Sequence, residues 1–153
     1  MDNARESLTT HAAARGAEIR LKFGPEIGWD QLLQILSDRT CVRYPCKLDF
    51  DAAALEPGEC AYPEPLGERP EDGFRLCIHP WFAARRDCVP LLALYQIAAV
   101  NYGLFASPGD AEAFGAAVLG LPREQYYSEL CALADELHAD FPSEDGPGCG
   151  CSG

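Results

Sequence analysis

The sequence predicts an α+β fold, in which a small antiparallel or mixed sheet from the N-terminal half packs against about three helices from the C-terminal half. Three observations lead to this prediction. Short segments before residue 80 alternate apolar and polar residues, which is the period of a strand. Apolar residues after residue 88 recur at helical spacing, and the last twelve residues offer almost nothing to bury. We therefore expect one globular domain over residues 1–141 and a flexible tail over residues 142–153.

Four elements are expected in the first fifty residues. Residues 1–17 are rich in alanine and lack apolar periodicity, which predicts a frayed or loosely helical lead-in. In residues 18–24 apolar residues alternate with mostly charged ones, so we expect a short strand. Residues 29–38 have the spacing of a helix, and residues 41–50 return to the alternation of a strand. Pro45 has no N–H group, which places that strand at a sheet edge or at a bulge.

The middle of the chain is expected to be a long loop followed by a strand. Residues 51–73 are rich in proline and glycine, which excludes a long regular element and leaves room for a short strand near Cys60. Six carboxylates define what we call the acidic loop, residues 56–72: Glu56, Glu59, Glu64, Glu68, Glu71 and Asp72. They form either a docking surface for a basic protein or an ordinary solvated loop. Residues 74–79 alternate again and predict a strand.

The second half reads as three helices. Residues 88–109 hold no charged side chain, but Pro90, Gln96 and Asn101 lower their apolarity, so we expect a buried central helix rather than a membrane span. Gln96 and Asn101 would then need hydrogen-bond partners inside the protein. The Ser-Pro-Gly-Asp sequence at residues 107–110 and Pro122 with its following acidic residue predict the starts of two further helices.

Composition limits the classes of function. The 153 residues contain twelve Lys and Arg against twenty-four Asp and Glu, and the formal net charge is -12. Such a charge repels nucleic acids and anionic membrane surfaces. The first residues lack the apolar run of a secretory signal. We therefore expect a cytoplasmic protein that binds neither nucleic acid nor membrane, while a protein partner with a basic surface is compatible with the charge and the oligomeric state is left open.

The C-terminal sequence GPGCGCSG contains the sharpest functional clue, because Cys149 and Cys151 stand on either side of a glycine. Reducing cytosol disfavours structural disulfides, so eight cysteines indicate burial, metal binding or redox chemistry. Two thiolates one residue apart can face one soft ion, and Gly150 permits the tight backbone that chelation needs. The candidate cofactors are zinc, copper(I) or an iron-sulfur cluster. The alternatives are thiol exchange with a partner's disulfide, or a tail without a selected role.

The four residues CGCS at 149–152 resemble the Cys-Gly-Cys end of the A-type iron-sulfur carrier proteins, in which thiols near the C-terminus help to hold a cluster. They are also similar to the thiol-rich tails of some copper chaperones. The resemblance is confined to these four residues, and the apolar residues that follow the pair in the carrier family are absent here. It implies that Cys149 and Cys151 hold a cluster or a copper ion.

Cys77 and His79 are a second pair of candidate metal ligands. They are two residues apart and so share one face of the predicted strand. Cys60 and Cys88 belong to the loop and the helix that flank this strand, and together the four residues could build a zinc site if the loop brings Cys60 close. Arg75 shares that face and opposes a cation, so the competing interpretation is a buried thiol beside a surface imidazole. No HExxH, GxSxG or phosphate-binding GxxxxGK[ST] sequence occurs, and the sequence therefore does not indicate an enzyme.

These features lead to one functional hypothesis and two alternatives. We expect a small protein that handles a soft metal or an iron-sulfur species through its C-terminal dithiol. The first alternative is a non-catalytic interaction module whose acidic loop binds a basic protein. The second is a thiol redox protein that uses the same dithiol.

Overall fold

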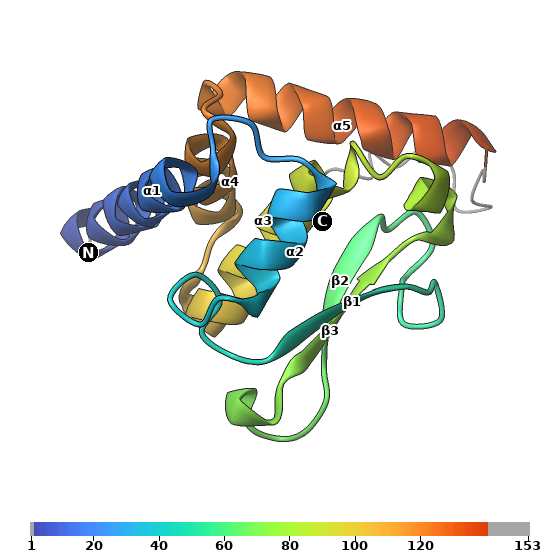
Figure 1. Cartoon of the computed structure of the whole chain (residues 1–153), viewed down its shortest axis with the longest axis horizontal. Coiled ribbons are helices and arrows are strands. Elements are labelled where there is room, and N and C mark those ends of the chain that lie inside the picture. The colour runs from blue at the N-terminus through green and yellow to red at the C-terminus, as the bar shows by residue number, and fades with distance from the viewer. Residues whose placement is uncertain (1, 141–153) are drawn as a thin grey trace.

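The computed structural model describes residues 2–140, with side chains for residues 7–103 and 105–140. These residues form five α-helices and one three-stranded mixed sheet, so the predicted α+β class is confirmed. The helices are α1 (Asp2–Phe23), α2 (Trp29–Ser37), α3 (Val89–Tyr102), α4 (Pro108–Leu119) and α5 (Arg123–Asp140), and the strands are β1 (Cys46–Phe50), β2 (Ala61–Pro65) and β3 (Phe74–Ile78). Figure 1 shows α1 beside α4 at one side, α5 across the top, and the sheet below. No helix of this part of the chain is long and apolar enough to cross a membrane.

The sheet combines parallel and antiparallel pairing. β1 runs parallel to β3 and β2 runs antiparallel to it, in the order β1-β3-β2. β1 is therefore an edge strand, which suits Pro45 directly before it because proline cannot donate to a neighbouring strand. The strand predicted over residues 41–50 is confirmed only from Cys46 onward, since residues 41–44 form a turn. The strands predicted near Cys60 and after Gly73 are confirmed as β2 and β3.

The central helix α3 is buried as predicted, and it holds a neighbouring turn in place. Asn101 is buried near its end, where its side-chain Oδ1 accepts a hydrogen bond of 2.8 Å from the backbone N–H of Arg43. The Nδ2 group of Asn101 donates one of 2.9 Å to the carbonyl oxygen of Cys41. A buried amide that satisfies two backbone groups avoids the cost of an unpaired polar group. The partner that the sequence required for Asn101 is thus the turn before β1.

The predicted starts of the last two helices are also confirmed. Ser107 caps α4, because its Oγ accepts a hydrogen bond of 3.1 Å from the N–H of Asp110 while the Asp110 carboxylate accepts one of 2.9 Å from the N–H of Ser107. α5 begins at Arg123, directly after Pro122. Tyr126, Leu133 and Leu137 are buried along α5, and Leu130 is partly buried against the core. Phe141 lies outside the described residues.

The strand predicted over residues 18–24 was wrong, because α1 runs unbroken from Asp2 through Phe23. The frayed or loosely helical lead-in predicted over residues 1–17 is a regular helix from Asp2 onward. The alternation that suggested a strand does not correspond to one buried face. Ile19 is 3% exposed and packs in the core, whereas Leu21 is 87% exposed. The two residues therefore point in different directions, as residues two apart do on a helix.

A stripe of small residues attaches α1 to α4. Ala12 and Gly16 are buried, and a β-carbon at position 16 would lie 2.5 Å from the carbonyl oxygen of Phe114. Only glycine permits this approach of the two helix backbones. Thr9 adds a hydrogen bond of 2.5 Å from its Oγ1 to Oδ1 of Asp110, which is fully buried. Close packing and this polar contact explain why an Ala-rich segment without an apolar stripe is a helix.

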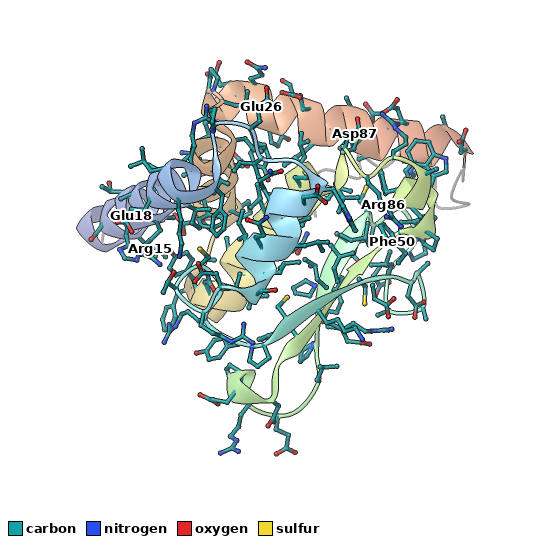
Figure 2. The ribbon with its side chains drawn as sticks, viewed as in Figure 1. Arg15, Glu18, Glu26, Phe50, Arg86 and Asp87 are labelled. Carbon is teal, nitrogen blue, oxygen red and sulfur yellow. The ribbon has the colours of Figure 1, made fainter. Side chains whose placement is uncertain are left out.

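A stack of three side chains packs between α2 and the sheet. The Arg86 guanidinium lies 4.9 Å from the centre of the Trp29 ring, and that ring stacks on Phe50 with 5.9 Å between centres. Figure 2 shows Arg86 and Phe50 near each other, far from the Arg15–Glu18 ion pair on α1. The stack joins the start of α2, the end of β1 and the segment before α3. Cation–π and aromatic contacts of this kind stabilise each junction by about 1 kcal/mol.

Candidate functional site

The face of the sheet opposite α3, which we call the outer sheet face, is built around Arg75. Its Nη1 atom lies 3.1 Å from a carboxylate oxygen of Asp49 and 3.0 Å from one of Asp51, and its Nε lies 2.9 Å from Glu64. The hydrogen bond to Glu64, followed by that to Asp51, raises the pKa of Arg75. A hydrogen bond from the N–H of Ala53, followed by that from Arg75, lowers the pKa of Asp51. Three carboxylates around one guanidinium leave this face anionic.

Cys77 lies on the same face but is fully buried. Its Sγ donates a hydrogen bond of 3.6 Å to the carbonyl oxygen of Arg75. Burial raises the pKa of the Cys77 thiol, although the nearby Arg75 charge opposes that shift. A metal binds the thiolate rather than the thiol, so ligation by Cys77 would require loss of this proton inside the protein. The alternative of a buried thiol, which the sequence had left open, agrees with this position.

His79 follows β3 and is half-buried. Its Nδ1 accepts a hydrogen bond of 3.1 Å from the backbone N–H of Trp81, and burial lowers its pKa, so the neutral imidazole is favoured. With Nδ1 as an acceptor, the proton of the neutral ring belongs on Nε2. Metal ligation through Nδ1 of His79 would therefore require loss of the Trp81 hydrogen bond, whereas ligation through Nε2 would require that nitrogen to lose its proton. As metal ligands, Cys77 and His79 stay a prediction.

The two cysteines expected to complete a zinc site lie in different places. Cys60 is alongside His79, whose N–H donates a hydrogen bond of 2.8 Å to the Cys60 carbonyl oxygen. Cys88 instead lies at the start of α3, where the guanidinium of Arg85 donates to its Sγ over 3.4 Å. In the part of the chain that the structure describes, no three His, Cys, Asp or Glu side chains are grouped so as to hold a metal ion. Cys149 and Cys151 lie outside the described residues.

The last turn of α5 is fixed at a definite place, which we call the tail root: Trp81, Arg85, Glu136 and Asp140. The indole Nε1 of Trp81 donates a hydrogen bond of 2.6 Å to the carboxylate of Asp140. Arg85 lies over the Trp81 ring, 5.2 Å from its centre, and pairs with Glu136 over 3.2 Å. Trp81 belongs to the short turn Pro80–Ala84 directly after His79, and Figure 1 shows the end of α5 close to this turn. The end of α5 therefore lies beside the turn that follows β3.

His138 is a functional candidate that the sequence did not reveal. It lies on α5 and is half-buried. Its Nδ1 atom is buried and has no hydrogen-bond partner among the described residues. The ring edge faces Gly58, because a β-carbon at position 58 would lie 3.6 Å from both Nδ1 and Cε1 of His138. No signal in residues 123–140 alone could predict this contact, since it depends on a loop eighty residues earlier.

Four cysteines in the described residues are protected by burial. Burial raises the pKa of the Cys46 thiol to about 11, and it also raises the pKa values of Cys41, Cys77 and Cys88. Thiols with raised pKa values are neutral at physiological pH and react slowly. Thiolate chemistry is therefore disfavoured at these positions in the folded protein.

Alkylation kinetics should separate these thiols from the tail pair. At pH 8 a free thiol is roughly one quarter thiolate, whereas one with the pKa of about 11 found for Cys46 is roughly 0.1% thiolate. We expect iodoacetamide to modify Cys46 at least about 100-fold more slowly than Cys149 and Cys151, with a rate that keeps rising up to about pH 11. Peptide mass spectrometry over time measures both rates. In urea all eight thiols should react alike, and equal rates in the folded protein would contradict the prediction.

Comparison with protein-family models, with curated proteins and with solved structures found no match for this chain. The possible function of this region therefore has to be inferred from its own residues. Near the end of β3, the Cys60 carbonyl oxygen accepts the N–H of His79, and Trp81, two residues after His79, holds Asp140 at the end of α5.

Proposed function

We propose that this protein binds a soft metal ion or an iron-sulfur species through Cys149 and Cys151 and transfers it to a protein partner. Zinc, copper(I) and an iron-sulfur cluster are the candidate cargoes, because thiolates select these species. The observation that supports the proposal is the hydrogen bond between Trp81 and Asp140, which fixes the end of α5, nine positions before Cys149 in the sequence. A chelating pair on a short segment with a fixed origin can bind an ion and still present it outward.

The segment is long enough for Cys149 and Cys151 both to bind an ion near the folded domain and to present it to a partner. Eight residues lie between Asp140 and Cys149, and an extended chain from one to the other spans at most about 30 Å. A protein of this size has a radius of gyration of about 15 Å, so the pair can return to the tail root or reach a docked partner. Both arrangements are needed by a protein that loads an ion and then hands it over.

The protonation of the other thiols also supports Cys149 and Cys151 as the binding site. A soft ion competes with a proton for sulfur, and a buried thiol with a raised pKa holds that proton strongly. Cys46 and Cys77 are in this state, and Cys88 is engaged by Arg85. An incoming ion is therefore expected to bind Cys149 and Cys151 in preference to these three positions.

Anaerobic titration with Cu(I), Zn(II) and a reconstituted cluster tests the proposal on two proteins, the full chain and a chain that ends at Asp145. We expect the full chain to bind and the shortened chain to lose that binding, because it lacks both thiols. Isothermal titration and elemental analysis measure the amount bound. Equal binding by the two proteins would show that the tail pair is not the site.

The anionic outer sheet face favours a second function, the binding of a basic protein. Arg75 holds Asp49, Asp51 and Glu64 in fixed positions, and the adjoining Glu68, Glu71 and Asp72 of the acidic loop are exposed. Fixed carboxylates attract a cationic partner in a way that weakens with added salt. A lysine-rich peptide should then bind equally to the full chain and to the chain ending at Asp145, whereas metal binding should distinguish them.

A further inference from the structure

We infer that β1 binds an extended segment of a basic partner protein, which joins the sheet as a fourth strand; this inference rests on the second proposed function, the binding of a basic protein. The sheet has the order β1-β3-β2, so among the described strands β1 has a neighbour on one side only. We call its other side the free edge. A partner segment that adds to such an edge supplies the hydrogen bonds that the edge strand lacks.

Alternate residues of β1 point their backbone groups at the free edge. The N–H of Phe74 donates a hydrogen bond of 2.8 Å to the carbonyl oxygen of Pro45, and the N–H of Asp51 donates one of 3.0 Å to that of Ile78. Backbone groups of successive residues point to opposite sides of a strand, so the odd-numbered residues from 45 to 51 face β3. The residues whose N–H and C=O groups face away from the sheet are the even-numbered ones: Cys46, Leu48 and Phe50.

The opposite edge of the sheet, formed by β2, is protected against such pairing. The carbonyl oxygen of Cys60 accepts a hydrogen bond of 2.8 Å from the N–H of His79, so the even-numbered residues of this segment face β3. Pro63 and Pro65 therefore lie at positions that face outward, and neither has an N–H group to offer a new strand. β1 contains no proline within its bounds. Of the two edges, only that of β1 can pair along its whole length.

The apolar side chains beside the free edge are incompletely covered. Leu48 and Phe50 are half-buried, whereas their partners on β3, Leu76 and Ile78, are fully buried. A fourth strand would place its own side chains against Leu48 and Phe50 on this face of the sheet. The apolar surface that it removes from water favours binding, so the segment should carry an apolar residue at every second position.

The charges of the outer sheet face determine the residues between these apolar positions. Asp49 and Asp51 stay partly exposed although Arg75 pairs with both, and Lys47 is exposed two positions before Asp49. Opposite charges on neighbouring strands attract, and like charges repel. The segment should therefore carry basic residues beside the two aspartates and an acidic residue beside Lys47. In the antiparallel direction this pattern corresponds to the sequence Lys-Val-Lys-Val-Glu-Val.

A synthetic peptide of this sequence, capped at both ends and labelled with a fluorophore, tests the inference by fluorescence anisotropy with the full chain. In the antiparallel pairing its valine N–H groups face β1, whereas its lysine and glutamate N–H groups face away. N-methylation of the first two valines should weaken binding by at least about 10-fold, because two backbone hydrogen bonds are lost. N-methylation of the two lysines is the matched control and should leave the affinity unchanged.

Substitutions in the protein test the same pairing from the other side. Leu48→Pro removes an N–H group at the free edge but none that faces β3, so it should weaken binding of the peptide. Asp49→Asn should also weaken it, whereas Asp135→Asn, at an exposed position on α5, is the charge-matched control and should not. Thermal unfolding shows whether Leu48→Pro is folded. If it is not, the two methylated peptides decide the question with the parent protein.

The outcomes separate this inference from the function on which it rests. If both methylated peptides bind like the unmodified one, or a scrambled peptide of the same composition binds equally well, strand addition is wrong and the binding of basic proteins stands. If neither this peptide nor a lysine-rich peptide binds, the second proposed function is wrong as well. A dimer in sedimentation that Leu48→Pro converts to a monomer would show that a second copy of the chain occupies the free edge, which would also overturn the inference.

Discussion

Serine at both Cys149 and Cys151 is expected to weaken Cu(I) and Zn(II) binding by more than about 100-fold. Removing only an outer-shell hydrogen bond from a metal ligand costs about 10- to 100-fold in affinity, and here two direct ligands are lost. A serine hydroxyl is also a hard donor that soft ions bind poorly. Competition with a chromophoric chelator measures the change, and the thermal stability of the metal-free protein should not move.

Cys131→Ser is the matched control for this variant. Cys131 is a half-buried free thiol on α5, outside the tail root, so its loss should leave metal affinity unchanged. The two single variants also address the redox alternative. A protein that keeps only Cys149 or only Cys151 should trap a mixed disulfide with a partner if the pair exchanges thiols, and failure of both to do so would count against that alternative.

Gly115→Ala is expected to destabilise the fold by about 3 kcal/mol, because overpacking and a displaced hydrogen bond together exceed the gain in helix propensity. A β-carbon at position 115 would lie 2.5 Å from Cε2 of the fully buried Tyr126, and closer still to its Cζ and Oη atoms. The Tyr126 hydroxyl donates a hydrogen bond of 2.6 Å to the carbonyl oxygen of Leu91. This one ring therefore ties α5 to α4 and α3, and urea unfolding measures the loss.

Gly109→Ala is the control within the same helix. The nearest atom to a β-carbon there is Nη2 at the flexible end of Arg123, 2.6 Å away, and the next atoms lie at 3.7 Å. Arg123 can move, so we expect stability within about 1 kcal/mol of the parent, the size of the helix-propensity gain. Equal losses at the two glycines would contradict the proposed clash.

A double-mutant cycle with Tyr126→Phe locates the cost of Gly115→Ala. Tyr126→Phe alone removes the Oη atom and its bond to Leu91, which should cost about 1 kcal/mol. The combined variant should lose less than the sum of the two single losses, because the hydrogen bond can be lost only once and one clashing atom is gone. Simple additivity would show that the methyl group at position 115 acts elsewhere.

Local sequence determined the elements whose signals lie within a few consecutive residues. Ser107 and Asp110 cap each other across one helical turn, so the start of α4 could be predicted without knowing its neighbours. The uncharged run of α3 and the alternation in β3 are likewise contained in their own segments. The need of Asn101 for partners also followed from the sequence, although the partners themselves did not.

Only the tertiary structure decided the features that depend on distant residues. Gly16 of α1 packs against Phe114, ninety-eight residues later. The segment has no apolar stripe from which this contact could be predicted. The same holds at the candidate site, where Trp81 occupies the Nδ1 atom of His79 and joins its own turn to Asp140. Gly58 similarly faces the ring edge of His138 that carries Nδ1, an atom without a hydrogen-bond partner among the described residues. A periodic pattern reports which side of an element is apolar, whereas the state of a ring nitrogen or the approach of two backbones depends on the atoms opposite, which the chain brings together only on folding.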